Sequence, residues 1–288
     1  STSKFTVIGS LQKARYKHTA LLLGDNTVVV IGGATTSSAA TGTIETFNST
    51  DGTFALLGDN LQSARLYHSA NLLSSGKVLV VGGRSSASST STTYLSSTDL
   101  YDPATASVSN GPALTTKRAH HTATVLQNGK VLIAGGISAG TDSGATYSAT
   151  HEDSIEISDP TGTVFTRGSA LKVKRAKHTA TLLNDGNVLL VGGATTDGEY
   201  LLTAELYDPE TATSALLDSK MPEGRLGHTA TLLSDGRVLI SGGAIQVEGD
   251  EGASTVEYTN TAVIFDPEAG TFGEAIELNS SRVYHSAA

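Results

Sequence analysis

Short apolar segments separated by polar turns recur along the whole chain, and residues 225–273 give the clearest copy of this pattern. An extended segment at 228–233 ends in a polar Asp235-Gly236 pair and is followed by an apolar run at 238–240. Glycine supplies the positive φ that a two-residue hairpin turn requires, so the pattern predicts two strands joined by a tight turn. These strands are called a and b below.

Strand b is apolar throughout in each copy, which predicts that neighbouring sheets cover both of its faces. A third strand, c, is predicted at 205–207, just before Asp208-Pro209. Aspartate followed by proline favours a turn, because the carboxylate accepts backbone N–H bonds and proline fixes φ. A fourth strand, d, follows this turn, as at Thr271-Phe272. Each copy therefore contains four short strands.

The copies are marked by an arginine three positions before a histidine, and by a Gly-Gly pair 14 residues after that histidine. The pairs are Arg15/His18, Arg65/His68, Arg118/His121, Arg175/His178, Arg225/His228 and Arg282/His285, and the glycine pairs begin at Gly32, Gly82, Gly135, Gly192 and Gly242. Successive histidines lie 50 to 57 residues apart. The distance from histidine to Gly-Gly is constant, whereas the length of the whole repeat varies. This combination indicates a repeat array with insertions in its loops.

The consensus R-x-x-H-T-A-x-L-L-x-x-G-x-V-L-x-x-G-G…E-L-Y-D-P resembles the kelch repeat, in the form found in bacterial proteins and galactose-oxidase-like propellers. The resemblance covers nearly the whole chain and implies an all-β fold, a β-propeller of four-stranded antiparallel blades. We expect one domain over 1–288 with five complete repeats, at 11–60, 61–113, 114–170, 171–220 and 221–278. Residues 1–10 and 279–288 would form a partial sixth blade. The missing strands would belong to a longer protein, or to a second molecule through self-association.

Composition narrows the possible partners. The 288 residues carry 19 Lys and Arg against 28 Asp and Glu, a net charge of −9, without a basic stretch, so no nucleic-acid or anionic-lipid partner is expected. No run reaches the ~20 apolar residues of a membrane span, so membrane insertion is not expected. Loops rich in Ser, Thr, Gly and Ala, with few lysines and no tryptophan, suggest a secreted or cell-surface bacterial protein.

The resemblance to galactose oxidase would imply a copper site built with a cysteine-linked tyrosine. The chain contains no cysteine, so this cofactor is excluded and none is expected. Glu248, Asp250 and Glu251 could offer oxygen ligands to calcium, but their spacing is neither that of an EF-hand nor that of an RTX repeat. We therefore expect no dedicated metal site.

Residues that recur at one register in every repeat are interpreted as structural. We expect the repeated histidines to hydrogen-bond backbone near the start of strand a, and the repeated arginines to bridge adjacent blades. The Gly-Gly pairs should permit positive φ and close approach of the backbone to the next blade.

Residues that do not recur are the candidates for function. In an a–b–c–d meander the b–c and d–a connections share one face, and the b–c loops here vary in length and content, as functional loops commonly do. The candidate binding residues on this face are Lys17, Tyr67, Tyr94, His120, Tyr147, His151, Lys177, Glu199, Tyr200, Tyr258 and Tyr284. We expect a non-catalytic module that binds a protein or a glycan through them.

Two alternatives stay open. One is a fragment of a kelch-type enzyme, similar to the sialic-acid mutarotases or to an oxidase without the Cys-Tyr copper cofactor. A mutarotase would require acid–base groups at the channel mouth, and His120 and His151 with Glu152 or Glu199 are the candidates. The other is a structural subunit of a surface fibre or layer, with blades completed between chains.

Overall fold

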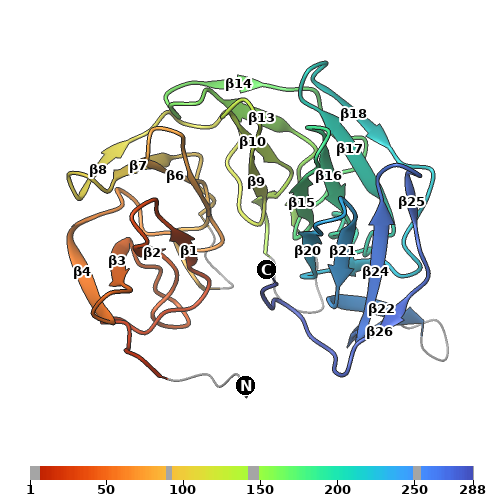
Figure 1. Cartoon of the computed structure of the whole chain (residues 1–288), viewed down its shortest axis with the longest axis horizontal. Coiled ribbons are helices and arrows are strands. Elements are labelled where there is room, and N and C mark those ends of the chain that lie inside the picture. Colours follow the sequence, from red (N-terminus) through yellow and green to blue (C-terminus); the bar gives the residue numbers. More distant parts are fainter. Residues whose placement is uncertain (1–6, 89–92, 142–148, 249–253, 288) are drawn as a thin grey trace. The chain divides into compact units, whose positions relative to one another are not determined.

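A computed structural model describes residues 7–88, 93–141, 149–248 and 254–287 (Figure 1). The chain divides into two compact units, Ser1–Ala119 and His120–Ala288, and each is described by itself. Tyr147, Asp250 and Glu251 lie outside the described residues, as do residues 4–6 at the start of the expected partial blade. No helix in the described part of the chain has the length and apolar character needed to cross a bilayer.

The first unit contains two four-stranded antiparallel sheets whose strands pair in chain order. One consists of β1 (Thr19–Leu22), β2 (Val28–Ile31), β3 (Thr43–Asn48) and β4 (Thr53–Asn60). The other consists of β5 (Ser69–Leu72), β6 (Val78–Val81), β7 (Thr98–Asp102) and β8 (Ser107–Asn110). These are the first two predicted repeats, each with the expected strands a to d.

The second unit contains three further antiparallel sheets of the same order. They comprise β9 (Thr122–Val125), β10 (Val131–Ala134), β13 (Ile155–Ser158) and β14 (Phe165–Arg167); β15 (Thr179–Leu182), β16 (Val188–Val191), β17 (Ala204–Asp208) and β18 (Thr213–Leu216); and β20 (Thr229–Leu232), β21 (Val238–Ser241), β24 (Thr261–Asp266) and β25 (Thr271–Phe272). A short strand β26 (Ile276–Glu277) adds to β24. The all-β prediction is confirmed.

The b–c loops of two repeats contain strands that the sequence pattern did not predict. They are β11 (Ile137–Ala139) and β12 (Thr150–His151) in the third repeat, and β22 (Ala244–Glu248) and β23 (Ser254–Tyr258) in the fifth, where β22 also pairs β19 (Arg225–Leu226). Long insertions must satisfy their backbone N–H and C=O groups, and pairing with each other does so locally. These loops are therefore built as small sheets.

The continuous apolar character of strand b follows from its packing on two sides. Within β16, Leu189 and Val191 belong to a core cluster shared with the fifth repeat, whereas Val188 and Leu190 belong to one shared with the third. Burying each such side chain contributes about 1.5–3 kcal/mol. The core is therefore a series of layers between consecutive sheets, as the sequence predicted.

The turn residues have the backbone conformation and the hydrogen bonds that the sequence predicted. Asn26, which stands where other repeats have glycine, has φ of 66°. Asp208 Oδ1 accepts a hydrogen bond from the backbone N–H of Glu210 at 2.8 Å, and Asn48 Oδ1 accepts one from Thr50 at the same distance in the first repeat, which lacks the proline. Both turn predictions are confirmed.

The start of a sixth repeat lies against the fifth in the second unit. The backbone N–H of Gly243 donates to the carbonyl of Arg282 at 2.8 Å, the same contact that Gly193 makes with Arg225 one repeat earlier. No strand is formed by the described residues 279–287. The partial sixth blade stays a prediction.

Candidate binding face

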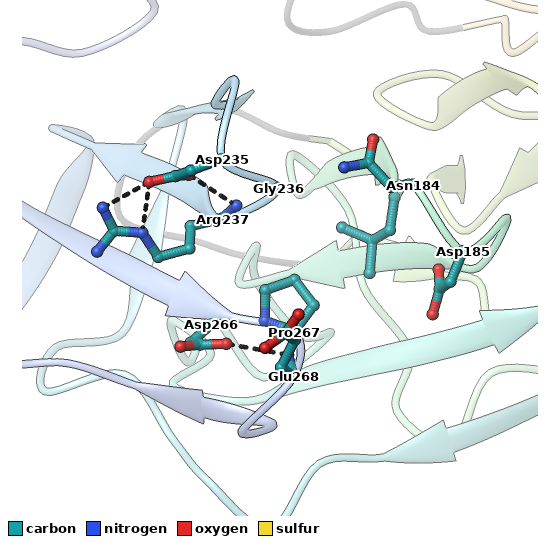
Figure 2. Close-up of a pocket in the computed structure, with 9 residues that line it drawn as sticks. Asn184, Asp185, Asp235, Gly236, Arg237, Asp266, Pro267 and Glu268 are labelled. Atoms are coloured by element: carbon teal, nitrogen blue, oxygen red, sulfur yellow. Dashed lines mark hydrogen bonds and ion pairs between the residues drawn. The ribbon is translucent and has the colours of Figure 1, made fainter.

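One hollow lies on the side of the short a–b and c–d turns (Figure 2). It measures 470 Å³ and is lined by Asp185, Asp235, Asp266 and Glu268, with Arg237 paired to Asp235 at 2.6 Å. Hollows of 300 Å³ and 270 Å³ occupy the same register between other pairs of consecutive repeats, one of them in the first unit. Because this groove recurs with the repeat, we interpret it as a feature of the architecture and not as a specific binding site.

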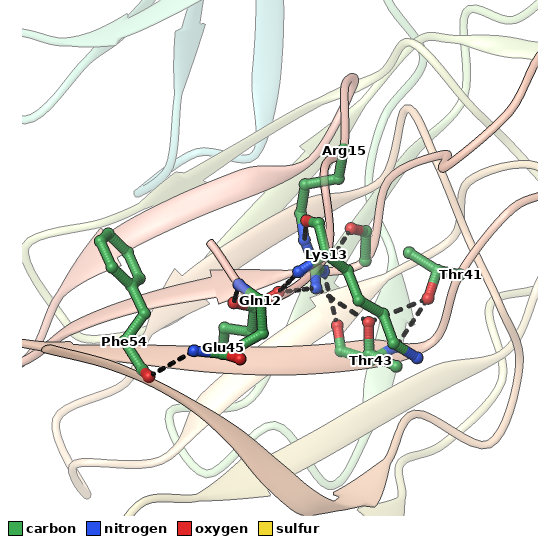
Figure 3. Close-up of polar contacts among 8 residues, drawn as sticks. Gln12, Lys13, Arg15, Thr41, Thr43, Glu45 and Phe54 are labelled. Atoms are coloured by element: carbon green, nitrogen blue, oxygen red, sulfur yellow. Dashed lines mark hydrogen bonds and ion pairs between the residues drawn. The ribbon is translucent and has the colours of Figure 1, made fainter. Parts of the chain in front are cut away.

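The repeated arginine holds its own repeat together (Figure 3). Arg15 Nη1 donates to the carbonyls of Gly32 and Thr43, both at 2.9 Å, and its Nη2 lies 2.5 Å from a carboxylate oxygen of Glu45. Glu45 also accepts the backbone N–H of Gln12 at 2.6 Å. The arginine therefore ties strands b and c to the segment that leads into strand a.

The same arrangement recurs at Arg65 with Asp99 and at Arg175 with Glu205. The prediction that these side chains bridge adjacent blades is wrong, because each guanidinium turns back to a carboxylate on strand c of its own repeat. The arginine's backbone makes the bridge instead: the carbonyl of Arg65 accepts the N–H of Gly33, in the preceding repeat, at 2.8 Å.

The repeated histidine links consecutive repeats through its side chain. His68 Nε2 lies 3.0 Å from Oγ1 of Thr19 in the first unit, and His228 Nε2 lies 2.9 Å from Oγ1 of Thr179 in the second. His178 makes the same contact with Thr122. The threonine, which follows the histidine of the preceding repeat, is a partner that the sequence did not predict. The expected backbone partners are present as well, because His68 and His228 also hydrogen-bond the backbone of Arg65 and Arg225 respectively.

Burial keeps these imidazoles neutral. It lowers the pKa of both His68 and His228 to about 3, and the charges of Arg65 and Arg225 respectively act in the same direction. The pKa of His178 is also lowered, mainly by burial and then by Arg175. Neutral, buried and hydrogen-bonded histidines are consistent with a structural role.

The Gly-Gly pairs have the close contacts that were predicted. A Cβ atom on Gly192 would lie 2.6 Å from the carbonyl oxygen of Arg225 and 2.9 Å from Cε1 of His228, both in the next repeat. Gly192 has φ of 61°, which glycine adopts without strain. The prediction of positive φ and close approach is confirmed.

The residue before each repeated histidine has left-handed backbone in all six copies. We call these the rim residues: Lys17, Tyr67, His120, Lys177, Gly227 and Tyr284, with φ of 57°, 54°, 55°, 58°, 64° and 52°. In the second unit they form a ladder, because the N–H of Lys177 donates to the carbonyl of His120 at 3.0 Å, that of Gly227 to Lys177 at 3.3 Å, and that of Tyr284 to Gly227 at 2.8 Å. The backbone is thus fixed from repeat to repeat while the side chain changes.

In the first unit two rim residues meet. Lys17 Nζ lies 4.5 Å from the ring centroid of Tyr67 and 5.0 Å from that of Tyr16. The exposed Tyr16 was not among the predicted site residues. In the other complete repeats, the position two residues before the histidine holds a residue other than tyrosine. This difference between repeats is the sequence signal that could have identified Tyr16 as a candidate.

In the second unit the remaining rim residues line a hollow of 320 Å³. Its lining consists of His120, His121, Lys177, His178, Gly227, His228, Tyr284 and His285. The ring of Tyr284 lies over Gly227, where a Cβ atom would come within 2.8 Å of Cε1 of that ring. Tyr284 is nevertheless 65% exposed. This hollow brings together the predicted residues His120, Lys177 and Tyr284.

The other predicted residues do not share this hollow. Tyr94 and His151 are only 4% and 1% exposed, so their prediction as surface contacts is wrong. Tyr94 packs under Arg84, whose guanidinium carbon lies 5.8 Å from the ring centroid. The backbone N–H of His151 donates to Thr196 Oγ1 of the next b–c loop at 3.2 Å. Both side chains are therefore buried and not available as surface contacts.

Three predicted residues lie on b–c loops outside the lining of the hollow. Glu199 and Tyr258 are exposed and Tyr200 is half-buried. The N–H of Tyr200 donates to Gln246 Oε1 at 2.9 Å, and Gln246 Nε2 donates to the carbonyl of Gly198 at 2.9 Å, so the fourth and fifth b–c loops are joined. His151 does not line the hollow that contains His120, so the described residues do not assemble the predicted acid–base pair there.

Metal-binding side chains are not grouped in the described part of the chain: no three His, Asp or Glu residues there are placed to hold an ion. The sequence also contains no cysteine to form the cross-linked tyrosine of a galactose-oxidase-type copper site. The residues present therefore do not fit that cofactor.

Sheets of this order, with these repeats, give the chain the fold of a kelch-type β-propeller. No family model and no curated protein matches the sequence. The solved structure of YjhT is similar over 91% of this chain and 84% of its own, with a TM-score of 0.67 and 14% identity. A fungal alcohol oxidase of the AA5 family, in complex with copper, is similar over 94% of this chain and 55% of its own, with a TM-score of 0.68 and 19% identity. At these identities the likeness shows the fold alone.

Proposed function

We propose that the chain is a non-catalytic binding module, extracellular or on a cell surface, that recognises a protein or a glycan. In each unit the recognition surface consists of that unit's rim residues and the exposed parts of its b–c loops. This proposal extends the sequence prediction, with Tyr94 and His151 removed from the surface and Tyr16 added to it.

The observation that supports it most is the choice of side chain at the rim. Left-handed backbone costs a non-glycine residue about 1 kcal/mol, and glycine is the residue that avoids this cost. Only one of the six rim positions holds glycine, whereas the other five hold lysine, tyrosine or histidine. Strained positions that keep large side chains are commonly functional, because the side chain is retained in spite of its conformational cost.

The loops around the rim offer suitable contact area. Tyr258 and Tyr284 are 62% and 65% exposed, and tyrosine provides a large, partly apolar surface at a low cost in side-chain entropy. The hydrogen bonds that join neighbouring b–c loops reduce the ordering cost of binding.

A binding panel with paired variants tests the proposal. Immobilised wild-type protein is screened against glycans and peptides, and Lys177→Gly and Tyr284→Gly are measured with each ligand found. We expect affinity to fall about tenfold or more in both variants, while the midpoint of thermal unfolding is kept or raised. Binding that survives both substitutions, or a panel without any ligand, would contradict the proposed surface.

A further inference from the structure

The rim residues differ from the rest of the chain in charge. The chain has 28 acidic and 19 basic side chains, yet two of the six rim residues are lysines and none is acidic. We propose that the rim recognises carboxylates, supplied by an acidic segment of a protein partner. This inference rests on the proposed function and names the ligand chemistry of the same surface.

The hollow of the second unit supports a carboxylate ligand through its hydrogen-bonding groups. Its lining residues include Lys177, Tyr284 and His120, and none of the described residues that line it is Asp, Glu, Asn or Gln. Ammonium and phenol groups donate to a carboxylate, and charge-assisted bonds of this kind are the stronger class. A group with several acceptor oxygens therefore finds donors here.

The same lining disfavours sugars. Each sugar hydroxyl carries a proton that needs an acceptor, and carboxylate and amide side chains are the usual acceptors in proteins. None of them lines this hollow. An acidic sugar would satisfy the lysine but would leave its hydroxyls poorly matched, so an acidic peptide fits the lining better than either a neutral or an acidic glycan.

Two buried histidines of the hollow, His178 and His228, add no positive charge near neutral pH. The pKa of His228 is lowered to about 3 and that of His178 is also lowered, in both cases mainly by burial. Lys177 is the one lysine or arginine among the residues given for this lining, and so supplies its permanent positive charge. Discrimination between an acidic and a neutral ligand should depend on this one side chain in the second unit.

The first unit repeats the arrangement at the same register. Lys17 is exposed and its Nζ lies over the rings of Tyr16 and Tyr67, at 5.0 and 4.5 Å from their centroids. The rings hold the ammonium in place while its exposed side stays available to a carboxylate. Each unit thus presents one rim lysine together with tyrosine.

The test compares matched peptides and matched lysines on the full chain. The probe is a capped oligoglutamate of about ten residues, with an oligoglutamine of equal length as the neutral control, measured by calorimetry. Lys17→Gln and Lys177→Gln remove the rim charges without adding glycine. Lys130→Gln, on an exposed a–b turn, removes an equal charge away from the rim.

We expect the wild type to bind oligoglutamate and not oligoglutamine, with affinity that falls as salt rises from about 50 to about 300 mM. Each rim substitution should weaken binding about tenfold, and Lys130→Gln should leave it unchanged. Equal binding by the rim variants and the wild type, or no binding of oligoglutamate, overturns the inference.

A parallel titration with polygalacturonate and with a neutral polysaccharide separates the two proposals. Binding of either polysaccharide at the rim without oligoglutamate binding overturns the acidic-peptide inference but keeps the proposed function. Absence of any ligand across the full panel overturns both.

Discussion

His228 Nε2 lies 2.9 Å from Oγ1 of Thr179, which follows the histidine of the preceding repeat, and this contact joins two consecutive sheets through their side chains. The same contact joins His68 to Thr19 and His178 to Thr122. One donor–acceptor pair, repeated along the array, therefore links each sheet to the next within a unit.

The lowered pKa values of these histidines predict that the protein loses stability in mild acid. The unfolded chain takes up a proton near pH 6.5 on each histidine, whereas folded His68 and His228 do so only near pH 3. The unfolded state thus binds more protons below pH 6.5, so the free energy of unfolding is highest above that pH. It should fall by up to about 1.4 kcal/mol per pH unit for each such histidine as the pH decreases.

Urea unfolding at several pH values between 7 and 5 measures this slope. His228→Gln keeps an amide near the threonine, but glutamine does not titrate. The slope of the free energy of unfolding against pH should therefore decrease by the amount that corresponds to roughly one bound proton. A free energy of unfolding that stays constant over this interval, or an unchanged slope in the variant, would show that the buried imidazoles do not control the acid response.

In the fifth repeat, the carboxylate that pairs with the repeated arginine is not on strand c. Val263 stands on β24 where other repeats have a carboxylate on strand c, and Arg225 pairs instead with Glu223 at 3.2 Å. The side chain of Glu223 is 36% exposed, whereas that of Glu205 is fully buried. Removing a buried partner leaves an uncompensated charge, so Glu205→Ala should cost about 3 kcal/mol, and Glu223→Ala only about 1 kcal/mol because solvent screens it.

Chemical denaturation of the two alanine variants checks this difference. Glu210→Ala, an exposed position on the c–d turn of the fourth repeat, serves as the surface control and should change stability little. Equal losses for Glu205→Ala and Glu223→Ala would contradict the assigned roles.

Gly227 and Tyr284 should be coupled. Alanine at position 227 must adopt φ near 64° and would place its Cβ 2.8 Å from Cε1 of Tyr284. We expect Gly227→Ala to lower stability by about 1–2 kcal/mol, and part of this loss to be absent when the same change is made in a Tyr284→Ala background. A double-mutant cycle gives the coupling energy, and strict additivity would argue against the contact.

Much of the architecture could be predicted because the motif repeats. The strands, the Asp-Gly and Asp-Pro turns, and the close contact at Gly192 all follow from residue types that act locally. The roles of arginine and histidine were exchanged in the prediction, because register along the chain does not show which repeat a side chain faces. Arg175 turns to its own strand c, and His178 reaches the repeat before it.

The site could be predicted only in part. The left-handed rim had a signal in the sequence, since Gly227 occupies a position that lysine, tyrosine and histidine fill in the other copies. The burial of Tyr94 and His151 had none, because it depends on how b–c loops pack against their surroundings. The patterning of one repeat does not contain that information.

We propose that the repeated residues hold the fold and that the rim residues bind the ligand, and substitutions at the neighbouring positions 177 and 178 test this division directly. Lys177→Gly and His178→Ala are compared in the same unfolding and binding assays, with the ligand found in the panel. Lys177→Gly should keep the stability of the wild type, or gain up to about 1 kcal/mol, and lose binding. His178→Ala should lose about 2–3 kcal/mol and bind normally where it is folded. The reverse pattern would contradict the account.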